Sequence, residues 1–65
     1  MIKSSLKALM EERGLTIMKM AELTGLATET ISRARDARIG ACTLNTLATI
    51  AAALGVKVKD LFEEE

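Results

Sequence analysis

The chain has 65 residues, enough for one small domain with a thin margin of stability. Hydrophobic residues make up 49% of it, which excludes a disordered tail, and nine basic residues balance nine acidic ones. With one cysteine, Cys42, and no histidine, the chain lacks the residues for an intrachain disulfide, a zinc site or histidine acid–base catalysis. We therefore expect no enzyme, no cofactor and no metal site.

The distribution of apolar and charged residues further limits the class of protein to which the chain can belong. The longest near-apolar stretch, residues 47–56, is too short to span a bilayer, and residues 1–5 lack the features of a signal peptide. We expect a cytoplasmic protein with no membrane partner. Residues 30–42 carry a local charge of +2 and residues 60–65 a local charge of −4. A surface that binds phosphate must therefore lie in the middle of the chain.

Four glycines divide the chain into segments with the length of short helices. The first predicted helix runs from about Ser5 to Arg13, with Ile2 and Leu6 among its apolar positions and Gly14 as its stop. The second begins after a capping threonine at 16 and ends at a glycine at 25, and the third spans about 28–36.

The second half of the chain predicts two more helices. The fourth begins after Thr43 and ends at Leu54, and its wide apolar face begins with Leu44. The fifth is short and runs from about Lys59 to Glu64. The expected fold is therefore all-α, with five short helices.

Residues 14–35 hold two predicted helices that are separated by only a few residues, and such a short turn makes the helices cross steeply. Close crossing requires a small residue, which Ala21 supplies, and the turn requires a residue that tolerates positive φ, which Gly25 supplies. Apolar side chains must fill the angle between the helices, and the candidates are Met20, Leu26, Ile31 and Ala34.

This stretch, GLTIMKMAELTGLATETISRAR, resembles the helix-turn-helix of the Cro and lambdoid-repressor (XRE) family of regulators. The resemblance extends to EERGLT before it and to TLNTLATIAAALGVKVKDLF after it. It implies a five-helix lambda-repressor-like domain over residues 1–65, with the helix-turn-helix at helices 2 and 3. The implied function is a transcriptional regulator, a repressor, that binds double-stranded DNA.

Helical geometry selects the side chains of the third helix that would meet DNA. Because each residue turns by about 100°, the face opposite Ile31 and Ala34 points outward, and the amino-terminal end approaches base edges in this motif. The resemblance independently implies base reading by residues 28, 29 and 33. The candidate base contacts are Thr28, Glu29, Ser32 and Arg33.

The chemistry of two of these candidates is specific. Arg33 can donate two hydrogen bonds to guanine, and Glu29 can accept one from cytosine. The two residues are also four apart, so they can simply pair on the surface of the free protein.

Phosphate contacts are expected next to the third helix and at the starts of the second and fourth helices, where backbone amides are unpaired. The candidates are Thr16, Ile17, Lys19, Arg38, Thr43 and Asn45, and a capping or plain surface role explains several of them equally well. The chain departs from the family where Ala27 replaces the usual capping hydroxyl, so Thr28 is an alternative cap. Arg35 could reach Glu11 or a phosphate.

Two copies of such a domain would read an inverted repeat. The resemblance implies a homodimer through the carboxy-terminal region, with Val56, Val58, Leu61 and Phe62 as candidates, although these residues could instead only close the monomer core. The alternative function is a protein-interaction module, such as the antitoxin partner of a toxin or the partner of another regulator, with weak or autoregulatory DNA binding.

Overall fold

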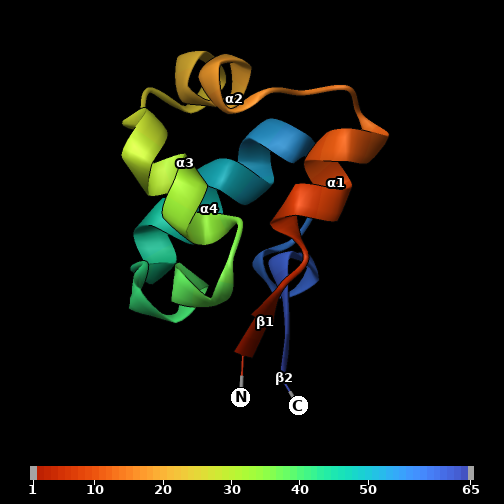
Figure 1. The fold of residues 1–65 in the computed structure, drawn as a ribbon, viewed down its shortest axis with the longest axis vertical. Coiled ribbons are helices and arrows are strands. Elements are labelled where there is room, and N and C mark those ends of the chain that lie inside the picture. The colour runs from red at the N-terminus through yellow and green to blue at the C-terminus, as the bar shows by residue number, and fades with distance from the viewer. Residues whose placement is uncertain (1, 65) are drawn as a thin grey trace.

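The computed structural model describes residues 2–64, except the side chain of residue 37, and it is mostly helical (Figure 1). α2 lies at one end of the molecule and the two strands at the other, with α1, α3 and α4 between them (Figure 1). No helix within residues 2–64 is long and apolar enough to cross a membrane. The elements are β1 (Ile2–Ser4), α1 (Leu6–Glu12), α2 (Ile17–Thr24), α3 (Thr28–Ala34), the 3-10 helix η1 (Ala37–Ala41), α4 (Leu44–Leu54), the 3-10 helix η2 (Val58–Leu61) and β2 (Phe62–Glu64).

The predicted start and stop of α2 are confirmed. The Thr16 hydroxyl accepts a hydrogen bond from the backbone N–H of Lys19 at 3.1 Å, which satisfies one of the amides that a helix start leaves unpaired. Gly25 has a left-handed φ of 73°, and its N–H donates to the carbonyl of Ala21. A residue with a Cβ is disfavoured at this φ, so Gly25 allows the tight turn into α3.

α3 is shorter than predicted because another local structure follows it. It ends at Ala34, and the side chain of Asp36 accepts a hydrogen bond from the backbone N–H of Arg38 at 2.8 Å. An aspartate that bonds the backbone two residues on favours a turn over a continuing helix. Asp36 thereby caps η1, which the sequence did not predict.

The fourth predicted helix is confirmed. Thr43 caps α4 by accepting from the backbone N–H of Thr46 at 3.2 Å, and Gly55 ends it with a left-handed φ of 72°. The expected burial of Leu44 is wrong, since this side chain is 73% exposed in the first turn. The buried face begins one turn later and comprises Leu47, Ile50, Ala51 and Leu54.

The predicted fifth helix over residues 59–64 is wrong. η2 is a single 3-10 turn that ends at Leu61, and β2 follows it directly. So short a segment forms too few hydrogen bonds to repay the cost of helix nucleation. Glu63 and Glu64 would also place negative charge at a helix carboxy terminus, where the helix dipole disfavours it. Backbone pairing with the start of the chain satisfies these residues instead.

That pairing forms a two-stranded antiparallel sheet. Ile2 lies opposite Glu64, and Ser4 lies opposite Phe62, so Ile2 belongs to a strand rather than to the first helix. Next to the sheet, the N–H of Ser5 donates to the carbonyl of residue 61 at 2.8 Å. Within residues 2–64 the fold thus has four α-helices and a small sheet, so the all-α, five-helix prediction is correct only in part.

One apolar core holds the helices together, and the sheet is tied to α3 beside it. The hydroxyl of Ser4 donates to the carbonyl of Ala34 at the end of α3 and accepts from the N–H of Leu6 at 3.2 Å. Each helical element from α1 to η2 contributes at least one large buried side chain, so α3 is fixed relative to its neighbours. These side chains are Leu6, Met10, Met20, Ile31, Ile39, Ile50 and Leu61.

Candidate nucleic-acid interface

α3 buries one face and presents the other. Ile31 and Ala34 are fully buried in the core. Three of the four predicted base contacts, Thr28, Glu29 and Arg33, are exposed, and Ser32 is half-buried. The helix is capped by residue 27, an alanine without a side-chain acceptor, so Thr28 is the first helical residue and not the cap.

Glu29 and Arg33 do not form the surface pair that their spacing allows. Both side chains are exposed, and no ion pair within residues 2–64 involves either of them. The Arg33 guanidinium therefore keeps its hydrogen-bond donors for another partner, as a bidentate contact with a guanine edge requires.

Arg38 and Asp36 form a closely held pair just beyond α3. The Nε atom of Arg38 donates to both carboxylate oxygens of Asp36 at 3.1 Å, and Nη2 donates to one of them at 2.8 Å. These side-chain hydrogen bonds, together with the one from the Arg38 backbone N–H, lower the pKa of Asp36 below its ordinary value. The same side-chain hydrogen bonds raise the pKa of Arg38.

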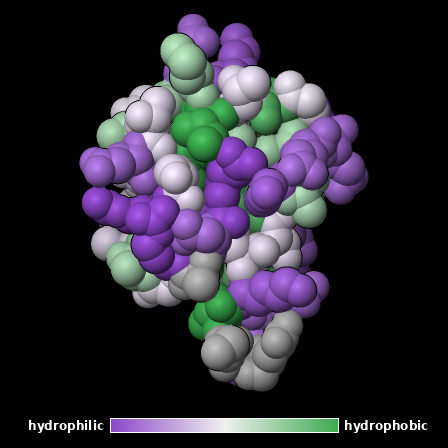
Figure 2. Space-filling model, viewed as in Figure 1, coloured by the Kyte–Doolittle hydropathy of each residue, from purple (hydrophilic) through white to green (hydrophobic). Residues whose placement is uncertain are grey.

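A surface hollow of about 350 Å³ brings predicted base and phosphate contacts together. Hydrophilic side chains gather on this side of the molecule, where α3 and η1 lie (Figure 2). Two guanidinium groups and three hydroxyl groups line the hollow. The Thr43 hydroxyl donates to the Thr46 hydroxyl at 3.0 Å, so the side-chain donors for anionic oxygens are the two guanidinium groups and the other two hydroxyls. The lining residues are Thr30, Arg33, Arg38, Ala41, Cys42, Thr43 and Thr46. Below, we call this the cationic hollow.

The remaining predicted phosphate contacts lie outside the lining of the cationic hollow. Asn45 is exposed on the first turn of α4. At the start of α2, Thr16 is exposed, whereas Ile17 is half-buried and packs against the core. Lys19 is exposed, with its Nζ atom 3.9 Å from a carboxylate oxygen of Glu22.

The arrangement agrees with the comparison to known families. The family model of the Cro/C1-type HTH DNA-binding domain matches residues 5–65. The chain belongs to this family. The match covers both helices of the helix-turn-helix and the residues that line the cationic hollow, and it makes DNA the partner of the domain. No curated protein matches the chain.

The sequence assigned no role to three residues that shape this face of the Cro/C1-type domain. Thr30 and Thr46 line the cationic hollow, and Asp36 holds Arg38 at its edge. A signal for Asp36 was present, because an aspartate two residues before an arginine can cap a turn and meet the arginine side chain. No comparable signal marked the threonines, whose positions depend on where tertiary packing places α3 and the first turn of α4.

Arg35 at the end of α3 is half-buried. Within residues 2–64 it forms no ion pair, so the contact with Glu11 that the sequence allowed is not present. Its Nε atom is buried and has no hydrogen-bond partner in that part of the chain.

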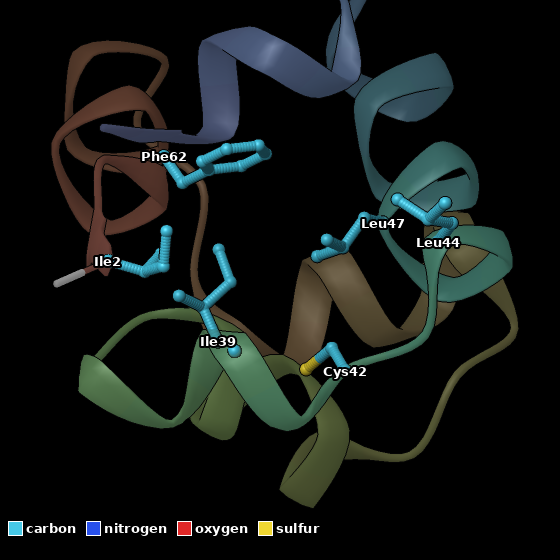
Figure 3. A pocket seen from close by; sticks show the side chains of 7 residues that line it. Ile2, Ile39, Cys42, Leu44, Leu47 and Phe62 are labelled. Atoms are coloured by element: carbon cyan, nitrogen blue, oxygen red, sulfur yellow. The ribbon is translucent and has the colours of Figure 1, made fainter. Parts of the chain in front are cut away.

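The predicted dimer residues mostly support the monomer core of the Cro/C1-type domain. Leu61 is fully buried, and Val56, Val58 and Phe62 are half-buried and packed against the core. Phe62 also lines a second, apolar hollow of about 180 Å³, into which side chains from the sheet, η1 and α4 point (Figure 3). Its lining comprises Ile2, Ile39, Gly40, Cys42, Leu44, Leu47 and Phe62.

Proposed function

We propose that this Cro/C1-type domain, residues 1–65, is a cytoplasmic, sequence-specific transcriptional repressor that reads an inverted repeat as a homodimer. The observation that carries the proposal is the exposed face of α3 beside the cationic hollow. Thr28, Glu29 and Arg33 are exposed on that face, and Ser32 flanks them. A helix held this way can enter the major groove with its amino-terminal residues toward the bases.

In this arrangement Arg33 reads guanine, and the rest of the hollow binds the DNA backbone. Arg38 and the start of α2 at Thr16, Ile17 and Lys19 supply donors for phosphate oxygens, and Thr43 is the phosphate contact at the start of α4. Backbone contacts of this kind fix the register of a protein on the duplex, and base contacts supply the specificity. The zero net charge of the chain predicts modest affinity, because few phosphates are neutralised.

The proposed dimer uses the half-buried side chains near the carboxy terminus. Val56, Val58 and Phe62 keep part of their apolar surface outside the core, and Leu61 supports them from within. Two recognition helices related by a dyad would read half-sites about one helical turn, or roughly 34 Å, apart.

Selection of bound duplexes from a random-sequence pool at moderate salt tests this function. We expect an enriched inverted repeat, and we expect Arg33→Ala to lose discrimination at one base pair in each half-site, by roughly 1–3 kcal/mol. Lys7→Ala, a change in α1 away from the cationic hollow, is the control and should leave the selected sequence unchanged. Failure to enrich any sequence, with no salt-sensitive retention of duplex, would overturn the proposal.

A second candidate function is a protein-interaction module, such as the antitoxin partner of a toxin or the partner of another regulator. Exposed apolar side chains favour it, since Met18, Leu23 and Leu44 are 75%, 52% and 73% exposed. Such a module would retain little duplex at any salt concentration. Autoregulatory antitoxins would combine both properties, and substitution of the three apolar residues would then abolish partner binding without changing the selected DNA sequence.

A further inference from the structure

The contact between Asp36 and Arg38 occupies only one edge of the guanidinium group. A guanidinium has five N–H donors in a rigid plane. Asp36 receives the Nε–H and one hydrogen of Nη2, at distances of 2.8 to 3.1 Å. The other hydrogen of Nη2 and both hydrogens of Nη1 point away from this edge. The free Nη2 hydrogen and the Nη1 hydrogen next to it form a second fork, which has the geometry to bind a phosphate through two parallel hydrogen bonds.

Asp36 is itself held in place by the backbone. Its carboxylate accepts from the N–H of Arg38 at 2.8 Å and so caps η1, which begins directly after it. The carboxylate therefore binds both the backbone N–H and the side chain of the same residue, Arg38. A flexible surface arginine would have to lose its rotamer freedom on binding DNA, whereas Arg38 has already lost part of that freedom in the free protein.

Arg38 lies where its free donors can contact a DNA backbone. Its side chain lines the cationic hollow together with Arg33 and Thr43. A DNA backbone that follows α3, the helix proposed to enter the major groove, would pass this hollow. A phosphate oxygen would then meet the free guanidinium fork at the edge of the hollow.

We infer that Asp36 is a positioning residue for DNA binding, which orients the Arg38 guanidinium so that its outer fork meets a backbone phosphate. This inference rests on the proposed function. The opposite role, in which Asp36 masks Arg38, predicts the opposite effect on DNA affinity. If Asp36 only masked Arg38, its negative charge would compete with phosphate, and removal of that charge would free the arginine and strengthen binding.

A double-mutant cycle separates the two roles. Asp36→Asn keeps an oxygen that can cap η1 but removes the charge that holds the guanidinium, and Arg38→Ala removes the group that is held. The affinity of the wild type, the two single variants and the double variant for the selected duplex would be measured across a salt series. Urea unfolding of each variant would confirm that all four proteins are folded under the assay conditions.

Removal of any acidic residue favours binding to a polyanion, and the cycle cancels this general effect because it occurs with and without Arg38. Glu12→Gln is the matched control, since Glu12 is exposed at the end of α1 and no ion pair within residues 2–64 involves it. We compare the change in Kd that Asp36→Asn causes when Arg38 is present with the change that it causes in the Arg38→Ala background. We expect the first change to be less favourable to binding by a factor of at least about two, the lower limit for coupled residues in contact. Arg38→Ala should also reduce the salt slope by about one.

A second substitution tests the fork itself. Arg38→Lys keeps the charge but offers no planar pair of donors. We expect this variant to bind more weakly than the wild type and to be insensitive to Asp36→Asn beyond the effect seen for Glu12→Gln.

Zero coupling, or a cycle in which Asp36→Asn strengthens binding more with Arg38 than without it, would overturn the inference while leaving the proposed function in place. A wild-type protein that retains no duplex at any salt concentration would overturn both.

Discussion

The substitution Leu61→Ala tests whether η2 is a core element of the monomer or part of the dimer interface that the family resemblance implies. Leu61 is fully buried, and its backbone carbonyl accepts from the N–H of Ser5 at 2.8 Å. Alanine keeps that hydrogen bond but removes the buried side chain. The loss of transfer free energy and the cavity left behind cost about 2–5 kcal/mol at fully buried leucines.

This loss is large for so small a chain. Typical stabilities per residue give a total of ~3–10 kcal/mol for a domain of 65 residues. The variant should therefore lose about half of its free energy of unfolding, and its Tm should fall by at least about 10 °C. Leu44→Ala is the matched control because Leu44 is 73% exposed, and its stability should change by less than about 0.5 kcal/mol.

Urea unfolding, followed by far-UV circular dichroism at several protein concentrations, measures these effects. A core role predicts a loss of stability for Leu61→Ala that is the same at every concentration. A dimer role predicts a loss that grows as the wild-type dimer forms, since subunit association stabilises the folded state by mass action. Equal effects of Leu61→Ala and Leu44→Ala, or a loss of stability seen only at high protein concentration, would show that η2 is not a core element of the monomer.

Three further predictions concern single contacts. Ser4→Ala should cost about 1–2 kcal/mol in urea unfolding, because it leaves the carbonyl of Ala34 without this donor; an unchanged midpoint would contradict this. Gly25→Ala should cost about 1 kcal/mol in the same assay through its positive φ alone, since a Cβ there would meet nothing within 4 Å. The carboxyl of Asp36 should titrate below its ordinary pKa by NMR and return toward it in Arg38→Ala. Because this folded-state pKa is lowered, the contribution of Asp36 to stability is present above its unfolded pKa and is lost as the pH falls through the folded value.

Local signals in the sequence predicted the ends of α2 and α4 well. Thr16 and Thr43 have the hydroxyl of a helix cap, and Gly25 and Gly55 have the freedom of a left-handed stop, so the ends of α2 and α4 could be placed almost to the residue. These features depend on residues only a few positions apart, which is why the linear sequence contains them.

Features that depend on distant residues could not be predicted in the same way. Each strand has three residues, too few for an alternating pattern, and each exists because its partner lies at the other end of the chain. The cationic hollow was predicted in part, since Arg33, Arg38 and Thr43 were selected as DNA contacts. The place of Thr30 in it depends on the tertiary arrangement that brings α3 and the first turn of α4 to one hollow.

The pairing of the first and last described residues has a consequence for biosynthesis. β1 is synthesised before all of the described helices and β2 after them, so the strand pair cannot form until residues 62–64 have left the ribosome. Ser4, which supports the end of α3, is held opposite Phe62 in that pair. A chain that is cut short before residue 62 would therefore contain both helices of the helix-turn-helix but lack the strand that holds Ser4 in place beside α3. Such a truncated chain should keep much of its helix content but hold α3 less firmly.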